Sequence, residues 1–379
     1  MKHVFIVGSR GYHVNYGGWE TFTSNLVDHF DNDTIFHVGM ITNNKSIKNS
    51  HPSSNVFVDP IFVKNKGSVK MLIYSVKSLK YYINYIEKNK ISNAYIYVLG
   101  LKLFNYLSIM RKKIKKLNIK IIVNPDGLEW RRSKWSYPIK KYFLISEKLM
   151  LKHADTIICD GHGIKKYIDE KYPKFSNKTK YIAYGFDDID LSKTDYKKIL
   201  KEFNLKENDY LLMVGRCVPE NNYEMVIKAF MESNINKKLV IITNLSSSNY
   251  YNEIRKNTNF DKDDRIIFID GVYDKEKLCI IRKYAYLYIH GHSVGGTNPS
   301  LIEALSLTDL NILYDVCFNK DIGLETCLYF DSSKSLTNLF NNKKLLDNSK
   351  KKLGPLAKKR VYNNFTWKII VDKYKKIFR

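Results

Sequence analysis

Three glycine-rich loops carry the groups of this sequence that could do chemistry, and each loop follows a short apolar run. The first loop, Gly8–Glu20, comes directly after Val4–Val7. Glycine lets the backbone approach a ligand closely, and a helix that begins near Glu20 would direct unpaired N–H groups to the same place. The spacing is neither that of a dinucleotide fingerprint nor that of a P-loop. The loop therefore suits a phosphate or sugar hydroxyls, and the alternative is an ordinary strand-to-helix turn.

The second loop, Gly215–Asn222, carries an arginine at the carboxyl end of a predicted strand. The guanidinium of Arg216 can hold a diphosphate through two N–H groups, and the N-terminus of the next helix adds a favourable potential. The alternative is a surface ion pair of Arg216 with Glu220 or Asp270.

The third loop, His290–Asn298, leads into a helix that we expect to begin near Pro299, because proline is tolerated in the first turn. Backbone N–H groups of residues 296–300 would then point at a ligand. Glu303 lies one turn inside this helix and can accept hydrogen bonds from vicinal hydroxyls such as those of a ribose. The alternative is a solvated glutamate that the helix dipole favours.

No metal site is expected from the sequence. His290 and His292 lack a third ligand at useful spacing, so a hydrogen bond from His292 to a bound ligand is the preferred interpretation. Asp31–Asp33 and Asp188–Asp190 fit a DxD pattern that can hold a metal, but such triplets are common and these lie in a predicted loop and a predicted linker.

Short β-branched runs alternate with amphipathic basic stretches along the chain, which predicts parallel strands joined by crossover helices. The first series is Val4–Val7, Ile35–Val38, Ala94–Leu99, Ile119–Val123, Thr156–Cys159 and Lys180–Tyr184. The second is Tyr210–Val214, Lys238–Thr243, Arg265–Ile269, Leu287–His290, Asn311–Tyr314 and Leu328–Phe330. We therefore expect an α/β protein with two doubly wound, Rossmann-like domains that face each other across a cleft. The expected parts are an N-terminal domain (1–188), a C-terminal domain (189–355) and a C-terminal helix (356–379) that packs back towards the N-terminal domain.

The composition limits the class of protein. A chain of 379 residues exceeds the size at which one core keeps growing, so about two domains are expected. The formal net charge of +25 favours an anionic partner such as nucleic acid, acidic lipid or a phosphorylated substrate. The five cysteines contain no CxxC pair, which favours a reducing cytoplasm over a disulfide framework. No apolar run reaches the roughly 18 residues of a membrane span, and no signal-peptide core follows Met1.

Four segments carry a resemblance to a known family: Gly8–Phe22, Asp126–Trp135, Gly215–Asn222 and His290–Glu303. They resemble the glycosyltransferases of family 4, which share the GT-B fold, and more narrowly the rhamnosyltransferase-like subgroup that builds bacterial capsule and other surface polysaccharides. The resemblance implies retaining transfer of a sugar from a nucleotide diphosphate donor, with no metal or other cofactor required.

The resemblance also implies roles for single residues. Arg216 would hold the diphosphate and act in catalysis, and Glu303 would bind the ribose or deoxyribose. The predicted donor-binding residues are Gly17, Gly18, Glu20, Gly215, Arg216, Glu220, Asn221, His292, Gly295, Gly296, Thr297, Asn298, Ser300 and Glu303.

Two positions depart from the wider family. That family has a lysine five residues after the arginine and a glutamate eight residues before the helix glutamate, where this chain has Asn221 and Gly295. The narrower subgroup shares both changes, so we interpret them as altered donor recognition. The leaving diphosphate would then depend on Arg216 and backbone N–H groups, or on a second cation from Arg10 or Arg131.

Glycosyl transfer passes through an oxocarbenium-like state while the diphosphate gains negative charge, so it demands charge stabilisation more than a strong base. Asp126 and Glu129 follow a predicted strand of the first domain and are the candidate catalytic carboxylates, which would orient the acceptor hydroxyl or stabilise the cationic ring. The alternative for Asp126 is a local turn with Gly127.

Basic and aromatic residues of the first domain predict an acceptor-binding and membrane-binding surface. The basic run is Arg111–Lys116, and the residues expected to bind the acceptor or membrane are Trp130, Arg131, Arg132, Lys134 and Trp135. The alternative is that these lysines and arginines only solvate the surface.

The predicted function is transfer of L-rhamnose from dTDP-rhamnose to a polyprenyl-diphosphate-linked saccharide, by a cytoplasmic enzyme bound to the anionic inner face of the plasma membrane. The first alternative is a hexosyl- or N-acetylhexosaminyltransferase that uses a UDP-sugar. A GT-B epimerase and a basic nucleic-acid-binding protein are further alternatives; the second lacks a recognised module and leaves the glycine loops unexplained.

Overall fold

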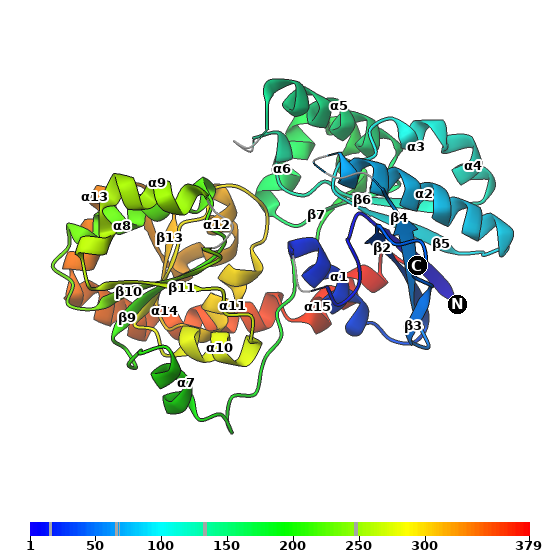
Figure 1. Cartoon of the computed structure of the whole chain (residues 1–379). Helices are drawn as coiled ribbons and strands as arrows, with labels where there is room; N and C mark the ends of the chain where they lie inside the picture. The colour runs from blue at the N-terminus through cyan, green and yellow to red at the C-terminus, as the bar shows by residue number, and fades with distance from the viewer. Residues whose placement is uncertain (15–16, 65–66, 68, 132–134, 246–248) are drawn as a thin grey trace. The chain divides into compact units, whose positions relative to one another are not determined.

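The computed structural model describes the chain apart from residues 15–16, 65–66, 68, 132–134 and 246–248 (Figure 1). The chain divides into two compact units, each built on its own sheet. Unit 1 comprises Met1–Gly185 and Trp367–Arg379, and unit 2 comprises Phe186–Thr366. No helix among the described residues is both long enough and apolar enough to span a bilayer.

Unit 1 alternates strands with helices. Its elements are β1 (Lys2–Val7), α1 (Gly18–Asp28), β2 (Thr34–Thr42), β3 (Ser50–Ser53), β4 (Val56–Phe62), α2 (Lys70–Lys88), β5 (Ala94–Leu99), α3 (Tyr106–Ile109), α4 (Arg111–Lys116), β6 (Lys120–Asn124), the 3-10 helix η1 (Glu129–Arg131), α5 (Tyr137–His153), β7 (Thr156–Cys159), α6 (His162–Lys171), η2 (Pro173–Lys178), β8 (Thr179–Tyr181) and α15 (Trp367–Lys375).

The described strands of unit 1 form an eight-stranded sheet in the order β3-β4-β2-β1-β5-β6-β7-β8. All neighbours are parallel except β3, which runs antiparallel to β4. The chain leaves β1 towards β2 on one side and leaves β5 towards β6 on the other. The topological switch point therefore lies between β1 and β5, and ligands of open α/β sheets bind at the carboxyl ends of such strands.

Helices cover both faces of the sheet in unit 1 (Figure 1). In the β1–β5 register Phe5 lies opposite Ile96 and Ile6 opposite Tyr97, so Phe5 and Tyr97 point to opposite faces. The Phe5 ring packs against Tyr82 of α2, with ring centroids 5.1 Å apart. Phe22 of α1 lies on the other face, against Tyr97 and against Tyr374 of α15.

The strand β4 is absent from the prediction, and with it the antiparallel edge strand β3. Asp59 and Pro60 interrupt the apolar run of β4 and are depleted in strands, which hid the pattern. The proline is tolerated because β3 pairs with β4 only between Val56 and Val58. Pro60 lies past the end of that pairing, where no N–H is needed.

Unit 2 has a second alternating series. Its elements are α7 (Tyr196–Glu202), β9 (Tyr210–Val214), η3 (Pro219–Asn221), α8 (Tyr223–Met231), β10 (Lys238–Thr243), α9 (Asn249–Thr258), η4 (Phe260–Lys262), β11 (Ile266–Asp270), α10 (Lys275–Lys283), β12 (Leu287–His290), α11 (Pro299–Leu307), β13 (Asn311–Tyr314), α12 (Cys317–Gly323), η5 (Leu324–Thr326), β14 (Leu328–Phe330), α13 (Ser333–Asn341) and α14 (Lys343–Asn364).

The described strands of unit 2 form a six-stranded sheet, parallel throughout, in the order β11-β10-β9-β12-β13-β14. Alternate residues of β9 point to opposite faces of the sheet and belong to two separate hydrophobic cores. Leu211 and Met213 pack with α8, α9 and α13, whereas Tyr210 and Leu212 pack with α7, α10 and Ala304 of α11. The switch point lies between β9 and β12, so the loops after these two strands leave the same edge of the sheet in opposite directions.

The C-terminal segment differs from the single helix expected over residues 356–379. Residues up to Asn364 continue α14 of unit 2, and a separate helix, α15, belongs to unit 1. The indole of Trp367 packs against Phe22, and a β-carbon on Gly185 would lie only 2.4 Å from that indole. The chain passes between the units at residues 185–186 and 366–367, and the Phe186 N–H donates to the Phe365 carbonyl (2.9 Å). The cleft that we expected concerns the relative placement of the units and stays a prediction.

Candidate functional sites

The two predicted donor loops of unit 2 are joined to each other at the switch point. The Nδ1 atom of His292 donates to the side-chain oxygen of Asn221 (2.8 Å). The N–H of Ser293 donates to the carbonyl of Glu220 (2.8 Å), and the side-chain amide of Asn222 donates to the carbonyl of Gly291 (2.7 Å). The segments 215–222 and 290–298 therefore form one hydrogen-bonded surface at the carboxyl ends of β9 and β12.

Arg216 lies in the loop after β9, and its side chain is exposed. Its backbone carbonyl accepts hydrogen bonds from the Val218 N–H (2.9 Å) and the Asn221 amide (2.7 Å), which fix the turn. Within the described part of the chain, its guanidinium makes no ion pair with Glu220 or Asp270. The alternative of a surface ion pair is thus not realised, and the cation is open to an anionic ligand.

The helix α11 begins at Pro299, as the sequence predicted. Asn298 caps it, because its side-chain oxygen accepts the Ser300 N–H at 3.0 Å. Gly295, which follows His292 in the same loop, has a φ of +144°. A β-carbon at Gly295 would lie 3.2 Å from the His292 ring. Thr297 is buried, and Gly296 and Asn298 are half-buried.

The structure shows what Asn221 and Gly295 do at the two positions where the resemblance would place a lysine and a glutamate. The side-chain nitrogen of Asn221 donates to the Arg216 carbonyl, and its side-chain oxygen accepts from the His292 ring. Asn221 thereby joins the two loops. A lysine at this position could donate but could not accept the bond from His292. Gly295 occupies a backbone conformation that residues with a β-carbon rarely adopt, so a glutamate there would be strained.

Glu303 is held by a residue that the sequence reasoning missed. Arg282 of α10 is 2% exposed, and its Nη1 lies 2.7 Å from Oε2 of Glu303. Its Nη2 donates to Oγ of Ser300 (3.0 Å). Arg282 was overlooked because it stands among lysines in an ordinary amphipathic helix, and nothing in its spacing points to α11.

His290 and Tyr288 continue this buried group below the loops. The Tyr288 hydroxyl lies 3.2 Å from Oγ of Ser300 and 3.4 Å from Nδ1 of His290. Burial, with a smaller contribution from His292, holds the pKa of His290 well below its usual value, so the imidazole is neutral. His290 therefore belongs to the core beneath the site rather than to its surface.

The glycine loop of unit 1 is tied down by Glu20. This carboxylate is buried on α1, and its Oε1 accepts the backbone N–H of Arg10 (3.0 Å). Gly17 precedes the helix with a φ of +116°, and a β-carbon there would lie 2.2 Å from Oε2 of Glu20. Gly17 and Gly18 are exposed, so the start of α1 is accessible. Glu20 thus positions the loop, and its contact with a donor stays a prediction.

The two candidate catalytic carboxylates lie after β6 and are both engaged locally. Asp126, with a φ of +66°, accepts the N–H of the next residue, Gly127, on Oδ1 (2.8 Å), and its own N–H donates to Oδ1 of Asn124 (2.9 Å). Glu129 lies in η1 and accepts the indole N–H of Trp135 on Oε1 (2.8 Å). Catalytic roles for the two carboxylates stay proposals.

Lys102 is a second residue that the sequence reasoning missed. It follows β5, the strand between β1 and β6, and its Nζ would lie 3.5 Å from a β-carbon placed on Gly100. Burial lowers its pKa, and the fields of Asp126 and then Glu129 partly oppose that shift. Among the described residues Lys102 makes no ion pair within 4 Å. A half-buried lysine thus follows β5 at the switch point of unit 1, in the field of both candidate carboxylates.

The aromatic residues predicted to bind a membrane are packed on unit 1 itself. The Trp130 ring lies against Tyr167 and under the ammonium of Lys171 of α6. The Trp135 ring packs on Phe143 of α5, with centroids 5.5 Å apart. The predicted basic residues Arg132 and Lys134 lie outside the described residues, and of Arg131 only the backbone, in η1, is described.

No group of three or more His, Cys, Asp or Glu side chains that could hold a metal occurs in the part of the chain that the structure describes. Asp31 of the first DxD triplet forms an ion pair with Lys375 of α15. Asp190 of the second accepts the Ser192 N–H (2.9 Å).

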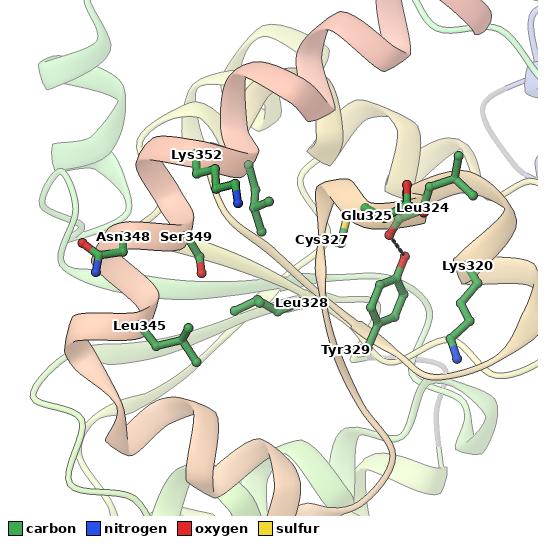
Figure 2. Close-up of a pocket in the computed structure, with 11 residues that line it drawn as sticks. Lys320, Leu324, Glu325, Cys327, Leu328, Tyr329, Leu345, Asn348, Ser349 and Lys352 are labelled. Carbon is green, nitrogen blue, oxygen red and sulfur yellow. Dashed lines mark hydrogen bonds between the residues drawn. The ribbon is translucent and has the colours of Figure 1, made fainter.

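A cavity of about 720 Å³ lies in unit 2 away from the predicted site residues (Figure 2). Its lining comes from α12, η5, β14 and α14 and includes Leu328, Leu353, Lys320 and Lys352. The Tyr329 hydroxyl donates to the Leu324 carbonyl (2.6 Å) at one side of it. None of the predicted donor-binding residues lines this cavity.

Comparison with known proteins bears on the fold and the class. Residues 1–187 match the family described as a domain of unknown function (DUF1972). An uncharacterized glycosyltransferase from Methanocaldococcus jannaschii is 25% identical over 406 residues, covering 100% of this chain and 99% of the relative.

Two solved structures align over the whole chain. The sucrose-phosphate synthase from Thermosynechococcus elongatus has a TM-score of 0.76 at 15% identity, with 100% of this chain and 98% of that chain covered. The Anabaena protein HepE in complex with UDP has a TM-score of 0.72 at 14% identity, with 100% and 99% covered.

These likenesses confirm the predicted fold: two units with parallel, Rossmann-like sheets, as in GT-B glycosyltransferases. The predicted enzyme class, a glycosyltransferase, agrees with the name of the full-length relative. The assignment to family 4 and to the rhamnosyltransferase-like subgroup stays a prediction.

Proposed function

We propose that the protein is a retaining glycosyltransferase that moves L-rhamnose from dTDP-rhamnose to a lipid-linked saccharide in bacterial surface polysaccharide synthesis. The observation that carries the proposal is the joining of the loops after β9 and β12 in unit 2, with the open guanidinium of Arg216 and the capped N-terminus of α11 on the same edge. A cation beside the positive end of a helix dipole favours a diphosphate.

In the proposed reaction Arg216 and the positive end of the α11 dipole stabilise the charge that develops on the departing diphosphate. The diphosphate oxygen takes the proton of the acceptor hydroxyl as that hydroxyl bonds to the anomeric carbon on the same face. HepE, which has this fold, was solved with UDP and with UDP-glucose, and this supports a nucleotide-sugar donor. A UDP-sugar is the alternative donor.

We assign the acceptor to unit 1, at the carboxyl ends of β1, β5 and β6. Lys102 and Asp126 offer a donor and an acceptor of hydrogen bonds for the hydroxyls of a sugar ring. We expect Lys102→Met to raise the KM for the acceptor about tenfold, the equivalent of one charge-assisted hydrogen bond, and to leave the KM for the donor unchanged. Steady-state kinetics with both substrates varied measure this, with Lys112→Met on the exposed face of α4 as the control. An unchanged acceptor KM would remove Lys102 from the site.

One face of α5 supports membrane association better than the packed tryptophans. Tyr137 and Ile145 are 69% and 51% exposed, and they alternate along the helix with exposed lysines. The spacing of three or four residues puts these side chains on one face, which we call the α5 face: Tyr137, Lys141, Ile145, Lys148 and Lys152. Mixed apolar and cationic side chains of this kind bind anionic bilayers.

We expect Lys141→Glu with Lys148→Glu to weaken binding to phosphatidylglycerol vesicles at least tenfold, since each basic residue contributes about 1 kcal/mol near an anionic surface. Vesicle sedimentation checks this. The control is Lys343→Glu with Lys351→Glu on α14, which makes the same change in net charge. Equal losses in both double variants would mean that only net charge matters, and the α5 face would not be the docking surface.

The proposed function is tested by release of nucleoside diphosphate from a panel of sugar nucleotides: dTDP-rhamnose, UDP-glucose, UDP-galactose and UDP-N-acetylglucosamine. The acceptor is a polyprenyl-diphosphate-linked saccharide. We expect release that depends on the acceptor and is fastest with dTDP-rhamnose. Faster release from a UDP-sugar would support the alternative donor, and consumption of donor without acceptor would favour an epimerase. Binding of RNA with no nucleotide turnover would overturn the proposal.

A further inference from the structure

Glu303 does not present a free carboxylate to the nucleoside, because Arg282 already occupies one of its oxygens. The Nη1–Oε2 distance of 2.7 Å is that of a short, charge-assisted hydrogen bond. Arg282 is almost completely buried, and a buried guanidinium is costly unless it is paired and hydrogen-bonded. The pair is therefore a fixed feature of the fold.

The surroundings of Arg282 hold the carboxylate in one place. Its other terminal nitrogen donates to Ser300 in the first turn of α11, the same helix that carries Glu303. Oγ of Ser300 also contacts the Tyr288 hydroxyl and the carbonyl of Val214 at the end of β9. The Glu303 side chain itself is 39% exposed, so part of its carboxylate faces outward while Oε2 is tied inward.

We propose that Arg282 fixes Glu303 so that a single carboxylate oxygen, Oε1, accepts one hydroxyl of the donor's pentose, and that this subsite takes 2′-deoxyribonucleotides as readily as ribonucleotides. The inference rests on the proposed donor-binding function of unit 2. It adds a positioning residue, Arg282, and the chemical class of nucleoside that the site accepts.

The kind of pentose that the subsite accepts depends on which carboxylate oxygen of Glu303 needs a partner. A carboxylate with both oxygens open binds a vicinal diol through two hydrogen bonds, and loss of one hydroxyl leaves a desolvated acceptor unpaired. In this structure Oε2 already has a cationic donor at 2.7 Å, so it does not need the 2′-hydroxyl. The 3′-hydroxyl, which both kinds of pentose carry, is enough for Oε1.

The first experiment compares UDP with dUDP, which differ only in the 2′-hydroxyl, by calorimetric titration of the full chain. We expect dissociation constants within about threefold of each other, because no buried acceptor is left unpaired when the 2′-hydroxyl is absent. A preference for UDP of more than about thirtyfold, the discrimination typical of a site built to bind that hydroxyl, would overturn the proposal.

The second experiment tests Arg282 as a positioning residue, with UDP and inorganic pyrophosphate as probes. We expect Arg282→Met to weaken UDP binding about tenfold and to leave pyrophosphate binding unchanged, because pyrophosphate needs only Arg216 and the loops. Arg282→Lys should restore part of the UDP affinity. Lys283→Met, which removes an exposed cation from the same helix, is the control.

A double-mutant cycle separates positioning from a general structural role. If Arg282 acts through Glu303, then Glu303→Gln costs less UDP affinity in the Arg282→Met background than in the wild type. Additive losses, or an equal loss of pyrophosphate binding in Arg282→Met, would mean that Arg282 only supports the fold.

If Arg282→Met does not fold, the single variant Glu303→Gln still tests the proposal. We expect it to weaken the binding of UDP and of dUDP equally, and a loss confined to UDP binding would overturn the one-oxygen assignment.

The outcomes for this inference and for the proposed function are distinguishable. If the wild-type chain binds neither pyrophosphate nor UDP, the donor site of unit 2 is wrong and this inference falls with it. If both bind and Arg282→Met changes neither affinity, only the role of Arg282 is overturned.

Discussion

Arg216→Ala should lower kcat/KM for the sugar nucleotide about 10²- to 10³-fold, the loss seen when one preorganised donor to a developing anion is removed. The guanidinium is exposed at the carboxyl end of β9 and makes no ion pair within the described residues, so its removal breaks no salt bridge of the fold. The backbone of the turn is held by the carbonyl of Arg216, which alanine keeps. The effect should therefore fall on the substrate and not on stability.

Initial rates with varied donor, together with a thermal melt, check this expectation. Arg255→Ala is the matched control, since it removes an exposed arginine of unit 2 whose partner is Asp261 on the surface. An isolated surface pair of this kind contributes little to stability and nothing to the proposed chemistry. Wild-type kinetics in Arg216→Ala would mean that groups other than this guanidinium neutralise the diphosphate, and the role of Arg216 would be overturned.

Local pattern was enough to predict the parts of the fold that position the sites. A strand, a glycine loop and a helix in succession appear at Val7, Val214 and His290, and the structure has β1, β9 and β12 ending at these residues. Parallel strands bring their carboxyl ends to one edge, so the loops after β9 and β12 had to meet once both strands belonged to one sheet. Pro299 indicated the start of α11 correctly, because proline and a capping asparagine act within a few residues.

Contacts between distant residues could not be predicted in the same way. Asn221 and His292 are 71 residues apart, and their hydrogen bond depends on how the two loops leave the sheet. Arg282 reaches Glu303 from another helix, and no periodicity marks a single buried arginine among exposed lysines. Lys102 follows a strand whose end we had recognised, but the field of Asp126 that acts on it is a property of the folded sheet.

Gly291→Ala should both lower the melting temperature and reduce donor binding, because the new methyl group would meet main chain. A β-carbon at this position would lie 2.2 Å from the carbonyl oxygen of Asn221, far inside van der Waals contact. The clash cannot be relieved by a side-chain rotation, so the loops after β9 and β12 must move apart. Overpacking of this kind costs about 1–3 kcal/mol of stability. A shift of the loops by about 1 Å is enough to reduce kcat/KM about 10²-fold.

Differential scanning fluorimetry and titration with pyrophosphate measure the two effects. Gly271→Ala is the matched control, since its β-carbon meets the ring of Tyr273, which is 74% exposed and can turn away.

Asn222→Gly tests the same loop junction without a clash, because glycine keeps the left-handed φ of +53° and loses only the hydrogen bond to the Gly291 carbonyl. It should weaken pyrophosphate binding in the same direction as Gly291→Ala but less. If Gly291→Ala is destabilised yet binds pyrophosphate like the wild type, the junction between the loops serves the fold alone, and the diphosphate must be held by the start of α11 without help from the loop of Arg216.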